Sequence, residues 1–213
     1  MKINEDLNRL TKNQRLYQLD VPVIGLTGGI ASGKTTVSHK LQEMGFAVIN
    51  ADHLVKDIYA LPETFEFIRS EFPDVIKNEQ IQFSLLRQYI FANKENKVKI
   101  ENFIYSRLAQ AFKAAFNKLD HPKMIIYDIP LLFEKSLQHL FDMTVLVYAP
   151  REIQRTRLMK RDNVLEEMAD TMLNNQMDIE EKKTKADFII DNSRSASELA
   201  EEINRLLRKL QIN

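Results

Sequence analysis

The sequence predicts an α/β fold, a doubly wound five-stranded parallel sheet with a helical insertion and a helical lid. Three observations carry this prediction. Short runs rich in valine and isoleucine alternate with segments of helical periodicity along the 213 residues. The runs are almost continuously apolar, as is typical of parallel strands that have helices on both faces. Helical segments separate the strands, so crossover connections are needed and the sheet should be doubly wound.

The first element is a strand over residues 21–26, followed by a glycine-rich loop and a helix over residues 34–44. Gly45 directly follows this helix and is a natural C-terminal cap, because glycine adopts the left-handed conformation at little cost. The four later strands are expected at residues 46–50, 123–128, 144–148 and 187–191.

Two long stretches interrupt the regular alternation. Residues 61–120 show no strand pattern and predict a helical insertion, with one helix over residues 97–119. Residues 151–185 are charged and helical and predict a lid between the fourth and fifth strands. The core domain is then expected to consist of residues 21–60, 121–150 and 186–213.

Residues 1–20 precede the first strand and are mostly polar. Their apolar residues have only a weak amphipathic spacing, at Ile3, Leu7 and Leu10. A segment with so little apolar surface to bury predicts a loosely attached N-terminal extension.

Composition limits the classes of function. Lysine and arginine number 30, as do aspartate and glutamate, and this zero net charge argues against nucleic acid or an anionic membrane as the main partner. The chain has no cysteine, which excludes disulfides and cysteine nucleophiles. No apolar run approaches the ~18 residues of a membrane span, and the first residues lack the apolar stretch of a secretion signal. We therefore expect a cytoplasmic protein, a monomer or weak homo-oligomer, that acts on small molecules.

The glycines are concentrated in one place, since all five lie between Gly25 and Gly45. Residues 28–35 read Gly-Gly-Ile-Ala-Ser-Gly-Lys-Thr, which matches the G-x-x-x-x-G-K-T phosphate-binding motif. Backbone N–H groups of such a loop and of the helix that follows attract phosphate oxygens. Lys34 should reach the β- and γ-phosphates, and the Thr35 hydroxyl should bind Mg²⁺. This phosphate loop (residues 28–35) predicts a fold of the P-loop NTPase type that binds a nucleoside triphosphate.

Two aspartates follow predicted strands at the edge where open α/β sheets bind ligands. Asp52 follows the second strand and could accept a proton from an acceptor hydroxyl or hold a Mg²⁺-bound water. As an alternative, it could be the N-cap of a helix that begins there. Asp128 ends the third strand, in the position of an acid that assists Mg²⁺, or is a solvated strand end.

Arginines are concentrated after the fourth strand. Arg151 and Arg155, like Arg157 and Arg161, are spaced four residues apart, so a helix would present arginine on two faces. On a lid, such side chains could close over phosphates and stabilise charge in the transition state. The alternative is a solvated helix, for which the segment also offers acidic residues.

The sequence patterns of a GTPase are not fully met in this chain. Residues 117–120 read Asn-Lys-Leu-Asp and fit the N-K-x-D guanine pattern, but they end a helical run instead of following a strand. No glycine lies three residues after an aspartate, so the D-x-x-G switch pattern is absent. A nucleotide-gated regulatory protein and a kinase for another nucleotide or nucleoside remain as alternatives.

An ordered set of motifs resembles the dephospho-coenzyme A kinases. The segments are Ile24 to Val37 with the phosphate loop, Val48-Ile49-Asn50-Ala51-Asp52, and Asp128-Ile129-Pro130-Leu131-Leu132-Phe133-Glu134. Arg157, Arg161-Asp162, Gln176, Ala186-Asp187 and Asp191-Asn192 also fit, so the resemblance covers about residues 23–210. It implies ATP-dependent phosphorylation of the ribose 3′-hydroxyl of dephospho-CoA, the last step of coenzyme A synthesis, with Mg²⁺.

The resemblance also implies roles for individual residues. Catalytic roles fall to Asp52 as the base, Lys34, and Arg157 as the transition-state arginine. ATP would contact Gly28, Gly29, Ile30, Ala31, Ser32, Gly33, Lys34, Thr35, Thr36 and Arg161. Dephospho-CoA would contact Thr27, Asp52, Arg87, Asp128 and Leu131. The metal ion would be held by Thr35 and Asp128.

The chain departs from the family pattern on the acceptor side. Tyr105-Ser106 stands where His-Pro is usual, Phe83 where arginine is usual, and Arg194 where glycine is usual. Two of these departures lie in the helical insertion, which would be the family's CoA-binding domain, so the pantetheine end is the part of the acceptor expected to be held differently.

Overall fold

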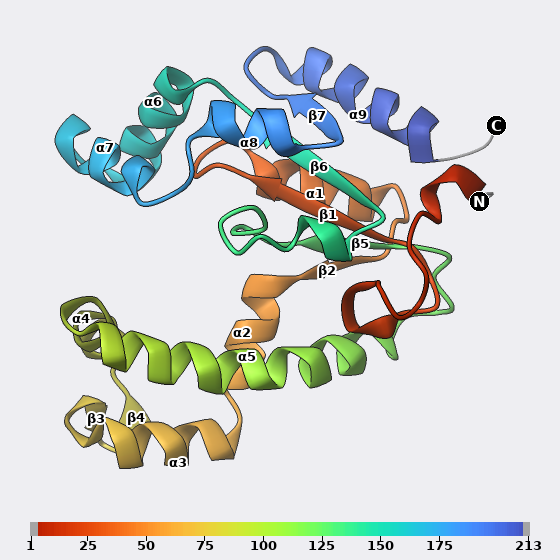
Figure 1. The fold of residues 1–213 in the computed structure, drawn as a ribbon. Coiled ribbons are helices and arrows are strands. Elements are labelled where there is room, and N and C mark those ends of the chain that lie inside the picture. The colour runs from red at the N-terminus through yellow and green to blue at the C-terminus, as the bar shows by residue number, and fades with distance from the viewer. Residues whose placement is uncertain (1–3, 211–213) are drawn as a thin grey trace. The chain divides into compact units, whose positions relative to one another are not determined.

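The structure is a computed structural model that describes residues 4–210, apart from the Glu5 side chain (Figure 1). Within them the chain forms two compact units. The core unit contains residues 4–50 and 119–210, and the helical unit contains residues 51–118. The predicted core is therefore interrupted by one continuous insertion.

A five-stranded parallel sheet forms the centre of the core unit, as the sequence predicts. Its strands are β1 (Val23–Gly28), β2 (Val48–Asn50), β5 (Ile125–Asp128), β6 (Met143–Tyr148) and β7 (Phe188–Asp191). Their order in the sheet is β2-β5-β1-β6-β7. Asn50 lies opposite Asp128, and Asp128 opposite Leu26, so β2 and β5 end side by side at the edge that β1 leaves to enter the phosphate loop.

Helices cover both faces of this sheet. α1 (Lys34–Glu43) and α9 (Ala196–Leu210) bury their apolar side chains against one face. The shared cluster includes Ile24, Leu26, Val37, Leu41, Val145, Val147, Leu199, Ile203 and Leu206. α8 (Ile179–Lys185) packs against the other face through Ile179, which meets Leu146 and Tyr148. Gly45 has φ 86°, which confirms its predicted place as the residue that follows the first helix.

The segment predicted as a lid consists of three helices. α6 (Arg151–Asp162) and α7 (Glu166–Asn174) pack together and precede α8. Leu158, Ala169 and Leu173 form a small buried cluster between them, and Ile30 and Ala31 of the phosphate loop pack against it. Helices α6 and α7 are thus in contact with the phosphate loop.

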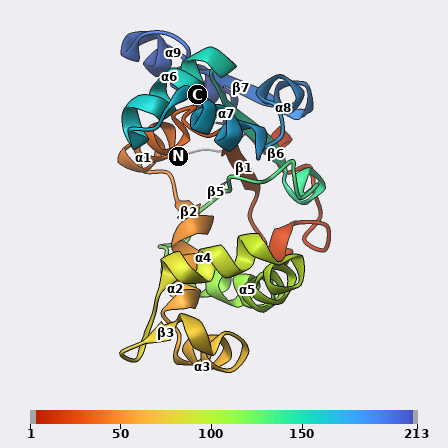
Figure 2. The same cartoon turned by 90° about the vertical axis from the view of Figure 1, so that its left-hand side faces the viewer.

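The helical unit is built around the long helix α5 (Lys94–Phe116), with α2 (Ala51–Tyr59) and α4 (Phe83–Ala92) alongside it (Figures 1 and 2). α3 (Pro62–Glu71) also belongs to this unit. The unit begins at residue 51, whereas the sequence predicts the insertion from residue 61. The difference is α2, whose side chains Val55, Ile58 and Tyr59 pack into the apolar cluster of the insertion.

The expectation of no strand between residues 61 and 120 is wrong in one place. β3 (Ile76–Lys77) and β4 (Gln80–Ile81) form a short antiparallel hairpin. Asn78 and Glu79 have φ of 49° and 56°, and two such residues in succession make a tight hairpin turn that usually contains glycine. Because the turn contains no glycine, the sequence pattern did not predict it.

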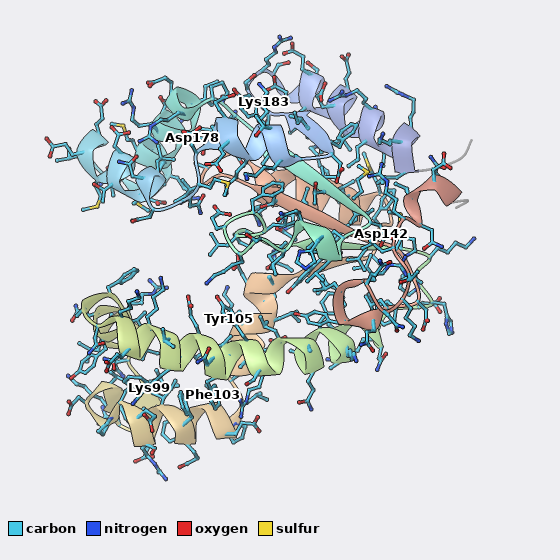
Figure 3. The ribbon with its side chains drawn as sticks, in the orientation of Figure 1. Lys99, Phe103, Tyr105, Asp142, Asp178 and Lys183 are labelled. Carbon is cyan, nitrogen blue, oxygen red and sulfur yellow. The ribbon has the colours of Figure 1, made fainter. Side chains whose placement is uncertain are left out.

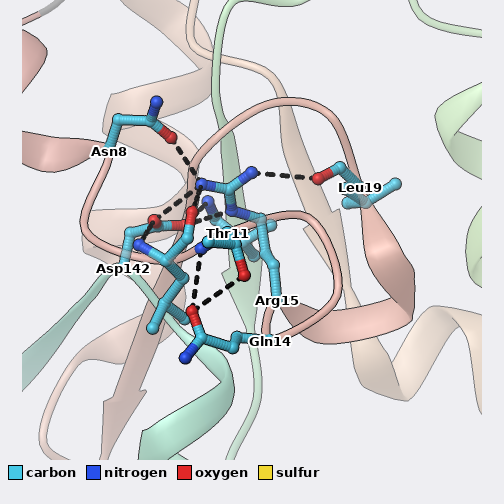
Figure 4. Close-up of polar contacts among 8 residues, drawn as sticks. Asn8, Thr11, Gln14, Arg15, Leu19 and Asp142 are labelled. Carbon is cyan, nitrogen blue, oxygen red and sulfur yellow. Dashed lines mark hydrogen bonds and ion pairs between the residues drawn. The ribbon is translucent and has the colours of Figure 1, made fainter.

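The N-terminal extension is also packed more firmly than the sequence predicts. Leu7, Leu16 and Leu19 are buried, and the Arg15 side chain is enclosed with that of Asp142 (Figure 4). Arg15 Nε and Nη2 donate to the two carboxylate oxygens at 2.6 and 2.9 Å, and Asp142 also accepts the Val23 N–H at 2.8 Å. A buried arginine therefore fastens the extension to the starts of β1 and β6. Ile3, part of the predicted spacing, lies outside the described residues.

Arg15→Met is expected to lower the free energy of unfolding by about 3–5 kcal/mol, because it leaves the Asp142 carboxylate buried without its counter-charge. Urea titration followed by circular dichroism measures this change. Lys12→Met is the matched control, because Lys12 pairs with Asp20 on the surface and should contribute less than about 1 kcal/mol. Equal changes in the two variants would show that the Arg15 contact does not hold the extension.

Candidate active site

The phosphate loop has the backbone conformation that its glycines permit. Gly33, which precedes α1, has φ 94°, in the region that favours glycine. A Cβ atom on Gly33 would collide with the Asn192 amide, and one on Gly29 with the Gln154 side chain. The chain can therefore turn tightly into α1, and no side chain caps the first turn of this helix, so its first N–H groups suit an anion.

Ala31 also has a positive φ, 57°, although it is not glycine. For an L-residue this conformation costs roughly 1–2 kcal/mol, and the greater freedom of glycine in the unfolded chain offsets part of the gain on replacement. Ala31→Gly is therefore expected to leave the free energy of unfolding unchanged or to raise it by up to about 1 kcal/mol. Thermal or urea unfolding would measure it.

Ala200→Gly, within α9 of the same unit, is the matched control and should lose roughly 1 kcal/mol, as glycine does inside helices. If Ala31→Gly were destabilised as much as this control, the loop alanine would not be strained.

Lys34 and Asp128 meet at the edge of the sheet. Lys34 is in the first turn of α1, and its Nζ forms an ion pair with Oδ1 of Asp128 at the end of β5. The other carboxylate oxygen accepts a hydrogen bond of 3.0 Å from Nδ2 of Asn50 at the end of β2. Asp128 is fully buried, so the alternative of a solvated strand end is wrong. Thr35 and Thr36 are exposed in the same turn of α1.

Arg157 is tied to the phosphate loop through Asn192. Its Nη2 donates to the Asn192 carbonyl at 2.9 Å, and Asn192 Nδ2 donates to the Ser32 carbonyl at 2.8 Å. Arg157 Nη1 and Ser32 Oγ are buried and have no hydrogen-bond partner among residues 4–210. An unpartnered donor and an unpartnered hydroxyl at one loop are groups that a bound anion could satisfy.

The other arginines of α6 pair with acids. Arg161 forms two hydrogen bonds to its neighbour Asp162, of 2.7 and 2.9 Å, and this guanidinium lowers the pKa of the Asp162 carboxyl. Arg151 and Arg155 both pair with Asp170 and so link α6 to α7. Among the four arginines of α6, Arg157 is therefore the one that these contacts join to the phosphate loop.

Two predicted acceptor-side residues also lie in the core unit. Thr27 is fully buried near the end of β1, and its hydroxyl donates to the Pro130 carbonyl at 3.1 Å. Leu131, which follows Pro130 in the chain, is 37% exposed and so presents an apolar surface beside this contact.

Asp52 and Arg87 belong to the helical unit, where both line a cavity of about 660 Å³. Asp52 is the second residue of α2 and exposed, which makes the N-cap alternative wrong because a cap precedes the first helical residue. The ring of Tyr59 meets that of Phe83 edge to face, with centroids 5.3 Å apart. Burial raises the pKa of Tyr59, and the positive charge of Arg87 partly opposes this. The cavity thus combines apolar walls with charges of both signs.

Some polar residues at the phosphate loop could be predicted only from the family resemblance, and others were not predicted from the sequence. Gln176 accepts the Ile30 N–H at 2.9 Å, and Gln154 donates to the Ala149 carbonyl at 2.7 Å with its other amide atom close to Gly29. Asn192 directly follows a strand, the same signal that singled out Asp52 and Asp128, so this pattern could have found it. Gln154 has no such signal.

Within residues 4–210, no helix is both long and apolar enough to cross a bilayer. The same residues contain no cluster of three or more histidine, aspartate or glutamate side chains suited to bind a metal ion.

Comparison with known proteins gives one consistent result. The family model described as dephospho-CoA kinase matches residues 22–198. A dephospho-CoA kinase of Fusobacterium nucleatum is 36% identical over 189 residues, covering 88% of this chain and 97% of that protein. One of Carboxydothermus hydrogenoformans is 37% identical over 196 residues, covering 90% and 95%.

Solved structures that cover most of this chain include a dephospho-CoA kinase. The protein TT1252 of Thermus thermophilus superposes with a TM-score of 0.81 at 26% identity, covering 89% of this chain and 97% of that one. Dephospho-CoA kinase from Campylobacter jejuni superposes with a TM-score of 0.64 at 29% identity, covering 88% and 96%. Shikimate kinase of Bacteroides thetaiotaomicron, at 12% identity and a TM-score of 0.52, shares the fold alone. With the family model, the relatives and the strand-edge site in agreement, the chain belongs to the dephospho-CoA kinase family.

Proposed function

We propose that the phosphate loop binds ATP with Mg²⁺ and that the enzyme transfers the γ-phosphoryl group to the ribose 3′-hydroxyl of dephospho-CoA, which yields coenzyme A. The observation that carries this proposal is the loop itself, with Lys34 paired to Asp128 and Arg157 held to Ser32 through Asn192. These groups supply the positive charge that a transferring phosphoryl group needs.

The residues fit a nucleotide and a magnesium ion. The loop offers a left-handed Gly33, an unpartnered Ser32 hydroxyl and the N-terminus of α1, all of which suit phosphate oxygens. The Thr35 hydroxyl and the Asp128 carboxylate are oxygen donors of the kind Mg²⁺ prefers, with water completing its shell. When bound, the ion would supply charge neutralisation between the β- and γ-phosphates.

We assign Asp52 the role of general base. As the 3′-oxygen forms its bond to phosphorus, its proton would pass to the Asp52 carboxylate, and the bond from the γ-phosphorus to the bridging oxygen would break to release ADP. Two facts support Asp52. It follows Asn50, a partner of Asp128, by two residues in the chain, and it lines the cavity of the helical unit together with Arg87.

That cavity is our candidate site for part of dephospho-CoA. Arg87 offers a positive charge for its phosphates, and Tyr59, Phe83 and Ile90 offer apolar walls. Phe83 is 48% exposed, and Tyr105, the other departure from the family pattern in this unit, is 45% exposed. Both are surface side chains that a ligand could contact.

An acceptor panel tests the proposal. Purified protein with Mg-ATP should release ADP quickly only when dephospho-CoA is added, and the product should be coenzyme A by mass spectrometry and by the phosphorus NMR signal of a 3′-monoester. Adenosine, AMP and phosphopantetheine are the comparison acceptors. Faster ADP release with another nucleotide or nucleoside would favour the alternative kinase, and release without any acceptor would favour a regulatory NTPase.

Three further predictions belong to the same proposal. They are a cytoplasmic place of action, a monomer or weak homo-oligomer, and small molecules, not nucleic acid or membrane, as partners. The balanced charge of the chain supports the last of these.

A further inference from the structure

A lysine on α8 is completely enclosed by the core unit. The side chain of Lys182 has no exposed surface, which is rare for lysine. Its Nζ lies 2.7 Å from Oε1 of Glu134 and 3.4 Å from the carbonyl oxygen of Gly28. The other carboxylate oxygen of Glu134 is buried and has no hydrogen-bond partner among residues 4–210. The ammonium group thus supplies the counter-charge of the Glu134 carboxylate.

The segment that contains Lys182 contacts each of the first three residues of the phosphate loop. Lys182 approaches the Gly28 carbonyl, Ile179 packs over Gly29, and Gln176 accepts the N–H of Ile30. The Met177 N–H donates to Oε1 of Glu134, the oxygen that also pairs with Lys182, at 3.2 Å. The segment from Gln176 to Lys182 therefore contacts three successive residues at the start of the phosphate loop.

The contact at Gly28 has a consequence for the next amide. The peptide group is planar, so a cation that holds the Gly28 carbonyl in one direction also fixes the direction of the Gly29 N–H. Two adjacent glycines would otherwise allow this peptide to rotate easily. An apolar residue in place of Lys182 could fill the space but could not orient the carbonyl.

We propose that Lys182 is a positioning residue of the kinase. Through Glu134 and the Gly28 carbonyl it holds the entry of the phosphate loop in the conformation that receives the triphosphate. This inference rests on the proposed binding of ATP by that loop. Lys182 itself does not contact the reacting atoms in this role.

The glycine content of the chain makes a direct test possible. Selective ¹⁵N labelling of glycine should give five backbone amide signals, from Gly25, Gly28, Gly29, Gly33 and Gly45. In Lys182→Met we expect the Gly28 and Gly29 signals to move while that of Gly45 stays in place. We also expect kcat/KM for ATP to fall by about 10- to 100-fold, as for a misplacement of the order of 1 Å.

The matched control is Lys183→Met, the same substitution at the next position. Lys183 (labelled in Figure 3) is on the same helix but 42% exposed, where its Nζ lies over the ring of Tyr148 at 4.2 Å. It should change neither the glycine signals of the loop nor kcat/KM. If Lys182→Met does not fold, the double variant Lys182→Met with Glu134→Gln removes both charges and serves in its place.

The outcomes separate the two proposals. If the variant loses thermal stability but keeps the Gly28 and Gly29 signals and kcat/KM of the wild type, Lys182 is only structural and the inference is overturned. If Mg-ATP fails to move the loop glycines of the wild-type protein, the proposed ATP site is wrong, and the inference falls with it. Shifted loop signals and reduced kcat/KM in the variant, with an ATP response in the wild type, support both.

Discussion

Lys34→Ala is expected to abolish nearly all turnover, with a fall in kcat of about 10³-fold or more. In the proposed function the Lys34 ammonium follows the β- and γ-phosphates during transfer, and its Nζ forms an ion pair with the buried Asp128 carboxylate. Initial rates of ADP release with saturating Mg-ATP and dephospho-CoA measure the effect. Lys40→Ala, on the same helix but in its last turn, should retain the wild-type rate.

Loss of Lys34 also leaves Asp128 buried without its counter-charge, so a folding defect must be distinguished from a catalytic one. Combining Lys34→Ala with Asp128→Asn removes that charge and should recover the circular dichroism spectrum and the unfolding midpoint, but not turnover. Retained turnover in folded Lys34→Ala would overturn the assignment of residues 28–35 as the ATP site.

The second large effect is expected for Asp52→Asn. An amide keeps the size of the side chain but cannot take the proton of the 3′-hydroxyl, so kcat should fall by about 10²-fold or more. The affinity for ATP should stay nearly unchanged, which fluorescence titration with an ATP analogue would show. Asp57→Asn is the matched control, since Asp57 is also exposed on α2. Undiminished kcat in Asp52→Asn would remove Asp52 from the catalytic residues.

Local sequence patterns are enough to predict the sheet and part of the site. The strands are apolar runs that must be buried, and the phosphate loop is a continuous motif, so neither depends on distant residues. Asp128 could be predicted for the same reason, because it ends one of these runs. The hairpin at residues 76–81 was missed because Asn78 and Glu79 make a glycine-type turn without glycine.

What the sequence could not reveal are polar contacts between residues far apart in the chain. Local patterns treat Arg15 as a solvated residue, but it is buried because Asp142, 127 positions later, supplies the opposite charge. Asn192 and Ser32 are 160 positions apart, and Lys182 and Gly28 are 154 apart. Such pairs follow from the order of strands in the sheet, which a single sequence does not specify.

The strand order also constrains how this enzyme folds during synthesis. β1, which leads into the phosphate loop, pairs with β5 on one side and β6 on the other, and both are translated after the entire helical unit. The helical unit is one uninterrupted segment and can make its local contacts as soon as it leaves the ribosome. β1 must wait, unpaired, until residues beyond 124 emerge. We therefore expect the ATP-binding half to be the last part of the nascent chain to become native, and the one most exposed to chaperones.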